Sequence, residues 1–317
     1  MSRTLSGTLL ALAAGCGYAF LPVFARLAYR AGLAPMDVLT WRFVLATAGL
    51  AMLAPIWWRW ANLRTLTRRD ALTLLGLGAL FAFVALMAFI GLVHVPAPIF
   101  SPIYYTYPAM TALLSALLGE KLPRTAWLAV TLAVGGCAIS ALTASSEVST
   151  FDPVNLLYPL ITAASYSIYL TIVGKRTSHI SGLASAVMGI LGALLIVMVA
   201  VVAIKLSVGF GVAGLMEVQT PASLDAWLPV AGIAFFSTIF TIMAMFMGIA
   251  RIGPARAAVL STIEPVVVII LSAPILHETI GQSQVLGSAM IVASVLLVNV
   301  PARANPAALE VELEQPQ

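Results

Sequence analysis

Long apolar runs separated by short polar gaps dominate this chain. A helix that crosses a bilayer needs about 20 mostly apolar residues, and ten runs reach that length. We expect spans at 7–27, 36–58, 71–93, 97–118, 124–144, 153–174, 182–206, 226–249, 255–276 and 281–300. Because backbone groups in lipid must bond internally, each span should be a helix. The pattern therefore predicts an all-α integral membrane protein with ten transmembrane helices.

The connections between these spans are short, with one exception. Residues 207–225 are long enough to form a real loop, and the polar, acidic tail at 301–317 is predicted to be disordered. The first 16 residues resemble a signal peptide. However, the apolar run continues beyond the roughly 7–15 residues of a signal core, so we interpret it as the first membrane helix.

Composition and charge agree with a membrane protein. Hydrophobic residues make up 61% of the chain and charged residues 9%, whereas soluble domains carry about 25% charge. The net charge of +4 does not indicate nucleic-acid binding, because the basic residues form short clusters between apolar runs. Cys16 and Cys137 lie inside such runs, and their spacing predicts neither a disulfide framework nor a metal site.

The positions of the basic residues predict an orientation. With the N-terminus in the cytoplasm, three of the 16 Lys and Arg residues fall outside (Arg26, Arg30 and Lys205), Arg42 lies within the second span, and twelve fall inside. The twelve are Arg3, Arg59, Arg64, Arg68, Arg69, Lys121, Arg124, Lys175, Arg176, Arg251, Arg256 and Arg303. Such a bias is typical of cytoplasmic loops. We expect both termini in the cytoplasm and the protein in a plasma membrane, namely a bacterial inner membrane.

Two stretches of the chain correspond to one another. "GLVHVPAPIFSPIYYTYP" at 91–108 and "GIARIGPARAAVLSTIEP" at 248–265 begin with Gly and end with Pro at a constant offset of 157, and Glu120 pairs with Glu278 at 158. The repeat unit is five helices, an odd number, so the second unit enters the membrane from the opposite side. Inverted repeats of this kind place the substrate site of secondary transporters near the midplane. We expect repeats at 1–145 and 150–300.

Four segments carry a resemblance to a known family. They are "WRF" at 41–43, "LLGEKL" at 117–122, "STIEPVVVIILSAPILHE" at 261–278 and "LGSAMIVASVLL" at 286–297. Across residues 7–300 the chain resembles the ten-helix EamA-type transporters of the drug/metabolite transporter superfamily. This resemblance implies two EamA repeats, a central cavity lined by helices 1, 3, 4, 6, 8 and 9, and export of small metabolites such as amino acids. Gly15 and Gly17 stand where the family often has a tryptophan-glycine pair.

Glu264 is the main candidate for function. It lies roughly 12 Å from Arg256 and roughly 20 Å from His277 along an ideal helix, which places it deep in the ninth span. A charged acid at a helix centre costs about 2.5–3.5 kcal/mol on insertion scales. Pro265 removes the helical partner of the Ser261 carbonyl and creates a flex point. The functional hypothesis is a site for a proton or a substrate ammonium, and the alternative is a hydrogen bond to a neighbouring helix.

Polar residues at helical spacing extend this candidate site. The predicted substrate-binding residues are Tyr18, Tyr104, Tyr107, Tyr166, Tyr169, Ser237, Thr241, Ser261 and Glu264, and the predicted hinges are Pro22, Pro108 and Pro265. The repeat pairs Tyr107 with Glu264, which predicts that the two lie across the pseudo-two-fold axis. The tyrosines are either packing residues with satisfied hydroxyls or an aromatic wall for flat or ammonium-bearing substrates.

Arg42 is expected to lie near the outer end of the second span. There it would anchor a loop or extend its charge to the interface. With Arg42 and Arg26 both peripheral, no cation would lie at mid-membrane to bind a phosphate. A phosphorylated substrate is therefore not expected.

The sequence favours a transporter over other classes of membrane protein. It has no Gly-rich phosphate loop for ATP and no catalytic motif such as HExxH, so we expect no enzyme, cofactor or metal site. The expected function is secondary active export of small metabolites, most plausibly amino acids or related amines. A broad-range exporter of organic compounds is the alternative, and a channel is less favoured. The expected partners are the substrate, the lipid bilayer and protons as coupling ions, with a monomer sufficient.

The predicted orientation can be tested with topology reporters. Fusions after residue 148 and within 207–225 should report the outside, and fusions at residues 66 and 317 should report the cytoplasm, because the excess of Lys and Arg holds those loops inside. A periplasmic signal from the fusion at residue 317 would contradict the ten-span topology.

Overall fold

The computed structural model describes residues 2–95, 100, 103–120, 122–141, 153–207, 218–276 and 282–298. The first half contains α1 (Arg3–Arg30), α2 (Pro35–Met52), α3 (Ala54–Ala61), η1 (Leu63–Thr65), α4 (Arg68–His94), α6 (Tyr107–Leu117) and α7 (Arg124–Ala141). The second half contains η3 (Pro153–Leu156), α8 (Leu157–Arg176), α9 (Gly182–Ser207), α10 (Leu224–Gly232), η5 (Ile233–Phe240), α11 (Thr241–Ile252), α12 (Pro254–Ser261), α13 (Glu264–Leu276) and α14 (Gln282–Val298). The predicted tail at 301–317, most of the 207–225 loop, and Glu278 lie outside the described residues.

Helices occupy the described parts of all ten expected spans, so the prediction of an all-α membrane protein is confirmed. Five continuous helical stretches are long and apolar enough to cross a membrane, at Arg3–Arg30, Arg68–Gly91, Val154–Arg176, Gly182–Ala203 and Leu224–Ile252. The second span is divided into α2 and α3, and the ninth into α12 and α13. The eighth span is continuous from α10 to α11, but η5 in its middle is π-helical, a geometry frequent at functional sites.

Contacts between helix ends define a surface that we call the N-terminal face, the end of the bundle where α1 begins. Arg3 donates a hydrogen bond to the carbonyl of Ala250 at 3.2 Å. Lys175, near the end of α8, donates to the carbonyl of Leu118 at 2.7 Å. At the same face, His179 lies 3.0 Å from Asp70. Near the end of α8, a Cβ atom added to Gly174 would lie 2.6 Å from Pro254, four residues after Ala250. The start of α1 and the end of α8 thus share one face, so these two helices run in opposite directions.

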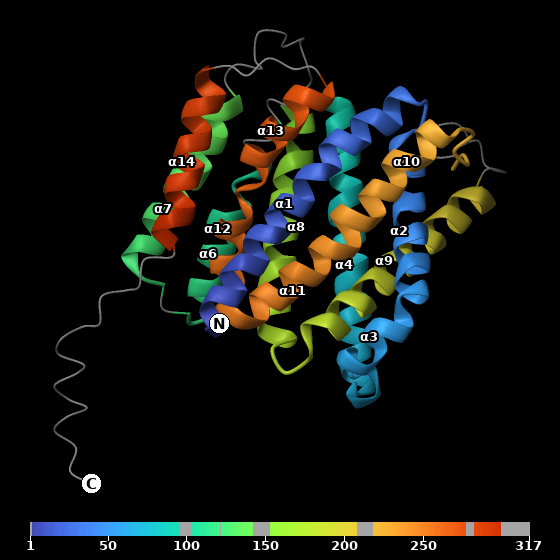
Figure 1. Ribbon diagram of the computed structural model, residues 1–317, viewed down its shortest axis with the longest axis horizontal. Helices are drawn as coiled ribbons and strands as arrows, with labels where there is room; N and C mark the ends of the chain where they lie inside the picture. Colours follow the sequence, from blue (N-terminus) through green and yellow to red (C-terminus); the bar gives the residue numbers. More distant parts are fainter. Residues whose placement is uncertain are drawn as a thin grey trace.

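The packing of the helices follows a two-fold pattern. The central helix α1 packs against α11, α12 and α13, while its repeat counterpart α8 packs against α4 and α6. Since α4 corresponds to the eighth span and α6 to the ninth, the two sets of contacts are equivalent. The last helices of the repeats, α7 and α14, pack against each other at one edge of the bundle (Figure 1). Antiparallel counterparts with equivalent neighbours are what an inverted repeat requires.

Small residues allow the helices to approach closely. On α4, a Cβ atom added to Gly78 would overlap the carbonyl of Gly189 and lie 2.7 Å from the backbone nitrogen of Ala193, both on α9. Lipid tails are as apolar as the helices, so backbone approach through small residues supplies much of the packing energy in membranes. By contrast, a Cβ atom added to Gly76, two residues away on α4, meets nothing within 4 Å.

These two glycines provide a matched test of the α4–α9 contact. Gly78→Ala should lower stability by about 1–3 kcal/mol, because overlap with backbone atoms cannot be relieved by a side-chain rotation. Gly76→Ala should leave stability nearly unchanged. Thermal unfolding of the purified variants in detergent measures both effects, and equal melting temperatures for the two variants would contradict the close approach of α4 and α9.

Candidate functional site

Two spans are interrupted at positions that correspond in the repeat. In the fourth span the chain turns at residues 105–106, and α6 begins at Tyr107. In the ninth span the chain turns at residues 262–263, and α13 begins at Glu264. The offset between the two turns is the 157 residues of the repeat. The inverted repeat therefore carries a matched pair of breaks.

A proline explains each break. Pro108 and Pro265 are the second residues of α6 and α13. Proline has no N–H, so the carbonyl four residues earlier, that of Tyr104 or Ser261, loses its helical hydrogen-bond partner. The ninth span is thus broken before Pro265, as the sequence predicts. The role of these two prolines as hinges stays a prediction.

The two breaks lie against each other. The hydroxyl of Tyr107 is 3.0 Å from Oγ of Ser261, and the Ser261 hydroxyl itself donates to the carbonyl of Ala258 at 2.9 Å. Since Ser261 has only one proton to donate, Tyr107 is the donor in their shared bond. Both side chains are buried. A direct hydrogen bond therefore joins the first residue of α6 to the last residue of α12, across the two repeats.

Glu264 begins α13 inside the bundle, and its side chain is 9% exposed. Its carboxyl group lies close to the side chain of Tyr105, and Tyr18 and Tyr107 are among the neighbouring tyrosines. Among the described residues, no Lys, Arg or His forms an ion pair with it. The repeat alignment singles out Tyr107 as the partner of Glu264, whereas the hydroxyl of Tyr107 bonds to Ser261. Tyr105 was absent from the predicted site, although its place beside Tyr104 and Tyr107 in a Tyr-rich turn could have indicated it.

Four of the predicted tyrosines form what we call the tyrosine cluster: Tyr18, Tyr104, Tyr107 and Tyr166. The ring of Tyr107 lies 5.2 Å from that of Tyr104 and 4.9 Å from that of Tyr166, measured between centroids. Tyr18 meets Tyr166 edge-on at 6.4 Å. The hydroxyl of Tyr166 is buried, and the nearest side-chain hydroxyl to it is that of Tyr18. The structure thus brings these four residues together, and contact of their rings with a substrate stays a prediction.

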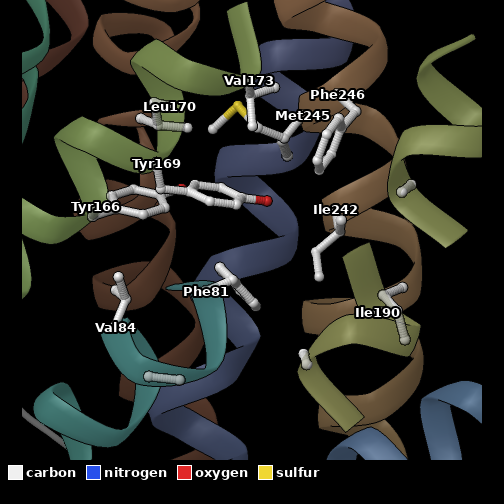
Figure 2. Close-up of a cluster of buried hydrophobic side chains, with 14 of the residues drawn as sticks. Phe81, Val84, Tyr166, Tyr169, Leu170, Val173, Ile190, Ile242, Met245 and Phe246 are labelled. Atoms are coloured by element: carbon white, nitrogen blue, oxygen red, sulfur yellow. The ribbon is translucent and has the colours of Figure 1, made fainter. Parts of the chain in front are cut away.

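Tyr169 connects the tyrosine cluster to an apolar core (Figure 2). Its ring stacks on Tyr166 at 5.9 Å and contacts Phe81 at 5.4 Å and Phe246 at 6.2 Å. Figure 2 shows Leu170, Val173 and Met245 around the same point, and all of these side chains are buried. The core lies on the side of the tyrosine cluster toward the N-terminal face, because α8 and α11 both end there.

Two glycines bring α1 against this site. A Cβ atom added to Gly15 would lie 2.7 Å from the carbonyl of Ser261, at the ninth-span break. A Cβ atom added to Gly17 would overlap the hydroxyl of Thr241 at the end of η5. The adjacent residue, Tyr18, is thereby held between the ninth-span break and η5. The two glycines that depart from the family pattern are thus points of close approach of α1 to the site.

The hydroxyls predicted on the eighth span have partners within the protein. Ser237 donates to the carbonyl of Gly17 at 3.0 Å, which ties η5 to α1. Thr241 donates to the carbonyl of Phe236 at 2.8 Å, five residues earlier. These bonds support the helix contact and the π-helical turn. Contact of Ser237 or Thr241 with a substrate stays a prediction.

Arg42 does not lie at the membrane surface, so the prediction that it anchors a loop or extends to the interface is wrong. Its side chain is 1% exposed, and Nε donates to the hydroxyl of Thr238 in η5 at 3.2 Å. The guanidinium carbon lies 4.8 Å from the ring centroid of Phe43 and 5.8 Å from that of Phe81. The long side chain points into the bundle because these rings and Thr238 provide a polar and π-rich environment there. The exclusion of a phosphorylated substrate, which assumes that Arg42 is peripheral, no longer follows.

A pocket of about 560 Å³ lies at the N-terminal face between α6, α7, α11 and α12. Glu120 and Arg256 line it, and Ala112 and Val259 mark its inner part. Val259 lies three residues before the ninth-span break at 262–263. The pocket therefore lies between the N-terminal face and the matched breaks.

The remaining candidates are simpler. Pro22 lies inside the uninterrupted helix α1, with no break at that position. His94 stacks on Tyr158 at 5.6 Å, and Cys16 and Cys137 are free thiols. In the described ranges, no three His, Cys, Asp or Glu side chains come together as metal ligands would.

The bond between the two repeats can be tested by a double-mutant cycle. Tyr107→Phe and Ser261→Ala each remove one partner, and the double variant removes both. Coupling energies for hydrogen bonds between membrane helices average about 0.6 kcal/mol and reach about 1.7 kcal/mol, so unfolding of the four proteins should give a coupling in that range. Tyr169→Phe in place of Tyr107→Phe is the control and should give no coupling. Additive effects of Tyr107→Phe and Ser261→Ala would show that the bond contributes nothing.

Comparison with known proteins agrees with this architecture. The sequence profile of the EamA-like transporter family matches residues 5–142 and again 153–300. The "Uncharacterized transporter YcbK" of Bacillus subtilis (strain 168) is 28% identical over 285 residues, which cover 89% of each chain. The "Uncharacterized inner membrane transporter YedA" of Escherichia coli (strain K12) is 27% identical over 205 residues, 65% of this chain and 62% of YedA.

The fold also matches a solved structure. A protein of known crystal structure superposes with a TM-score of 0.72 over 98% of this chain and 99% of its own, at 16% identity. At this identity the likeness shows the fold alone. The family profile covers both halves of the bundle, and each half contains one of the two matched breaks. The chain is a membrane transporter with two EamA repeats and belongs to the EamA-like transporter family.

Proposed function

We propose that the protein is a secondary active transporter that exports small metabolites, namely amino acids or related amines, across a bacterial inner membrane, with both termini in the cytoplasm. The observation that carries the proposal is the buried carboxyl of Glu264, set at a break in a membrane helix and beside the tyrosine cluster. An ionisable residue inside a membrane bundle is costly and typically marks a substrate or ion pathway. Aromatic rings near a carboxylate suit an ammonium group, which gains from both the charge and the ring faces.

The matched breaks support a transport mechanism by alternating access. Broken helices at the interface of inverted repeats are the typical binding elements of secondary transporters, and the halves move around them. On the N-terminal side, Tyr169, Met245 and Phe246 are buried. On the opposite side of the site, Phe20 and Phe236 stack at 5.0 Å but remain partly exposed. The proposed cycle opens the contact between α8 and α11 toward the pocket at the N-terminal face and closes α1 against η5.

Glu264 would serve as the coupling residue in this cycle. A carboxyl that binds either a proton or the substrate ammonium can exchange one for the other, which links substrate movement in one direction to proton movement in the other. The break at Pro265 frees the Ser261 carbonyl nearby as an additional acceptor. A broad-range exporter of organic compounds is the second candidate, because the ring faces of the tyrosine cluster do not discriminate strongly among flat cations.

Transport by the purified protein tests the function directly. In proteoliposomes with an imposed proton gradient, labelled neutral amino acids and their decarboxylated amines should show saturable accumulation. Uptake that does not saturate would indicate a channel, and accumulation of chemically unrelated cations would favour the broad-range exporter. Failure of every amino acid and amine in the panel would refute the proposed substrate class.

The role of Glu264 has its own test. Glu264→Gln keeps the shape and hydrogen bonding of the side chain but cannot release a proton, so it should fold normally and lose accumulation driven by the proton gradient. Exchange of substrate between the two sides can survive if the acid serves only the proton. Asp225→Asn, exposed in the first turn of α10, is the control and should accumulate substrate as the wild type does. A Glu264→Gln variant that accumulates substrate like the wild type at every pH would reduce Glu264 to a structural hydrogen-bonding residue.

A further inference from the structure

Arg42 is a cation deep inside the bundle. Phe81, 5.8 Å from its guanidinium, is the fourteenth of the 27 residues of α4. Thr238, its hydrogen-bond partner, is the fifteenth of the 29 residues of the span Leu224–Ile252. Both contacts therefore lie halfway along helices that cross the membrane. Although Arg42 is only the eighth residue of α2, its long side chain carries the charge to mid-bundle depth.

This charge is poorly neutralised by the protein. Within the described residues, no Asp or Glu forms an ion pair with Arg42. A buried charge without a partner costs several kcal/mol, and two ring faces and one hydroxyl offset only part of that cost. Such a residue is rare in membrane helices unless it serves a function.

Thr238 fixes the guanidinium in one orientation. The Thr238 hydroxyl donates its proton to the carbonyl of Ile233 at 3.1 Å, five residues earlier in the π-helical segment η5. Its oxygen is then free to accept from Nε of Arg42 at 3.2 Å. This bond uses one of the five N–H donors of the guanidinium. No acceptor is shown among the described residues for Nη1 and Nη2, the pair that binds a carboxylate in bidentate fashion.

Tyr18 connects Arg42 to the site already described. Its ring meets that of Tyr166, in the tyrosine cluster, edge-on at 6.4 Å. Gly17, the residue before Tyr18, is bonded through its carbonyl to Ser237, the neighbour of Thr238. Gly15, three residues before Tyr18, lies against the Ser261 carbonyl at the break that precedes Glu264. This part of α1 therefore lies between the segment that binds Arg42 and the break at Glu264, and the two charged groups form no ion pair with each other.

We propose that Arg42 binds the carboxylate of the transported substrate, while Glu264 binds its ammonium group and Tyr18 lies between them. Thr238 is a positioning residue that holds the guanidinium plane. The substrate class is then narrowed to zwitterions, because a bare amine leaves Arg42 unpaired and a bare acid leaves Glu264 unpaired. The assignment of Glu264 to the ammonium group rests on the proposed function, whereas the assignment of Arg42 to the carboxylate does not.

Binding of four matched probes to the purified protein tests this assignment. They are L-phenylalanine, 3-phenylpropionate, phenethylamine and 3-phenylpropanamide, which carry both charges, the carboxylate alone, the ammonium alone and neither. The readout is the rise in melting temperature as the concentration of each probe increases. The wild type should respond most strongly to L-phenylalanine, and 3-phenylpropionate should act at lower concentration than the amide.

Arg42→Gln should shift the half-maximal concentration of 3-phenylpropionate at least tenfold upward, and leave that of phenethylamine unchanged. Glu264→Gln should do the reverse. If 3-phenylpropionate stabilises the wild type and Arg42→Gln equally, or does not stabilise the wild type at all, the assignment of Arg42 is wrong. If phenethylamine has no effect on the wild type but 3-phenylpropionate does, the ammonium site fails while the carboxylate site stands.

If Arg42→Gln cannot be purified, variants of Thr238 test the assignment of Arg42 instead. Thr238→Val keeps the volume of the side chain but removes the acceptor of Nε, and should weaken binding of 3-phenylpropionate several-fold without affecting phenethylamine. Thr238→Ser keeps the hydroxyl and should behave as the wild type does. Equal responses of the wild type and Thr238→Val to 3-phenylpropionate would overturn the proposal.

Discussion

A membrane helix can break only where the protein satisfies the backbone groups that the break sets free. Lipid offers no hydrogen bonds, so a turn such as residues 262–263 is tolerated inside the bundle and nowhere on its lipid-facing surface. In this transporter the two breaks meet each other, and the bond between Tyr107 and Ser261 joins them. The close approach of Gly15 to the Ser261 carbonyl then fixes the position of α1. The arrangement of the site follows from placing two broken helices back to back.

Much of this architecture could be predicted from the sequence, because the features that indicate it are local. The length of an apolar run determines whether it can cross a bilayer, and a proline marks the position where a helix loses a hydrogen bond. The constant offset of 157 residues identifies which positions correspond in the two repeats. These three signals suffice for the spans, the inverted repeat, the break before Pro265 and the grouping of Tyr107 with Tyr104 and Tyr166.

The rest depends on which side of each helix faces inward, and the sequence carries little information about that. The second span is apolar around most of its circumference, so no polar stripe shows that Arg42 points toward η5 and not toward lipid. The same limit applies to Tyr169, which lies in the apolar core beside Phe81 and Phe246 and not at the breaks. Gly15 and Gly17 could be recognised as unusual for the family, but their role in close packing appears only when the ninth span and η5 are placed beside them.

A site with a buried arginine and a buried acid is expected to favour a zwitterionic substrate. Among the described residues, neither Arg42 nor Glu264 has an ion-pair partner, and the buried charge of Arg42 carries a desolvation cost that the protein alone does not offset. A substrate that carries both an acidic and a basic group can neutralise both charges at once while adding no net charge to the membrane interior. A substrate with only one charge leaves the other residue unpaired and adds a net charge that must cross the bilayer. On the proposed assignment, selectivity arises as much from the desolvation cost of the unoccupied site as from the contacts made by the bound substrate. The tyrosine cluster then needs only to accommodate the part of the substrate that lies between its carboxylate and its ammonium group.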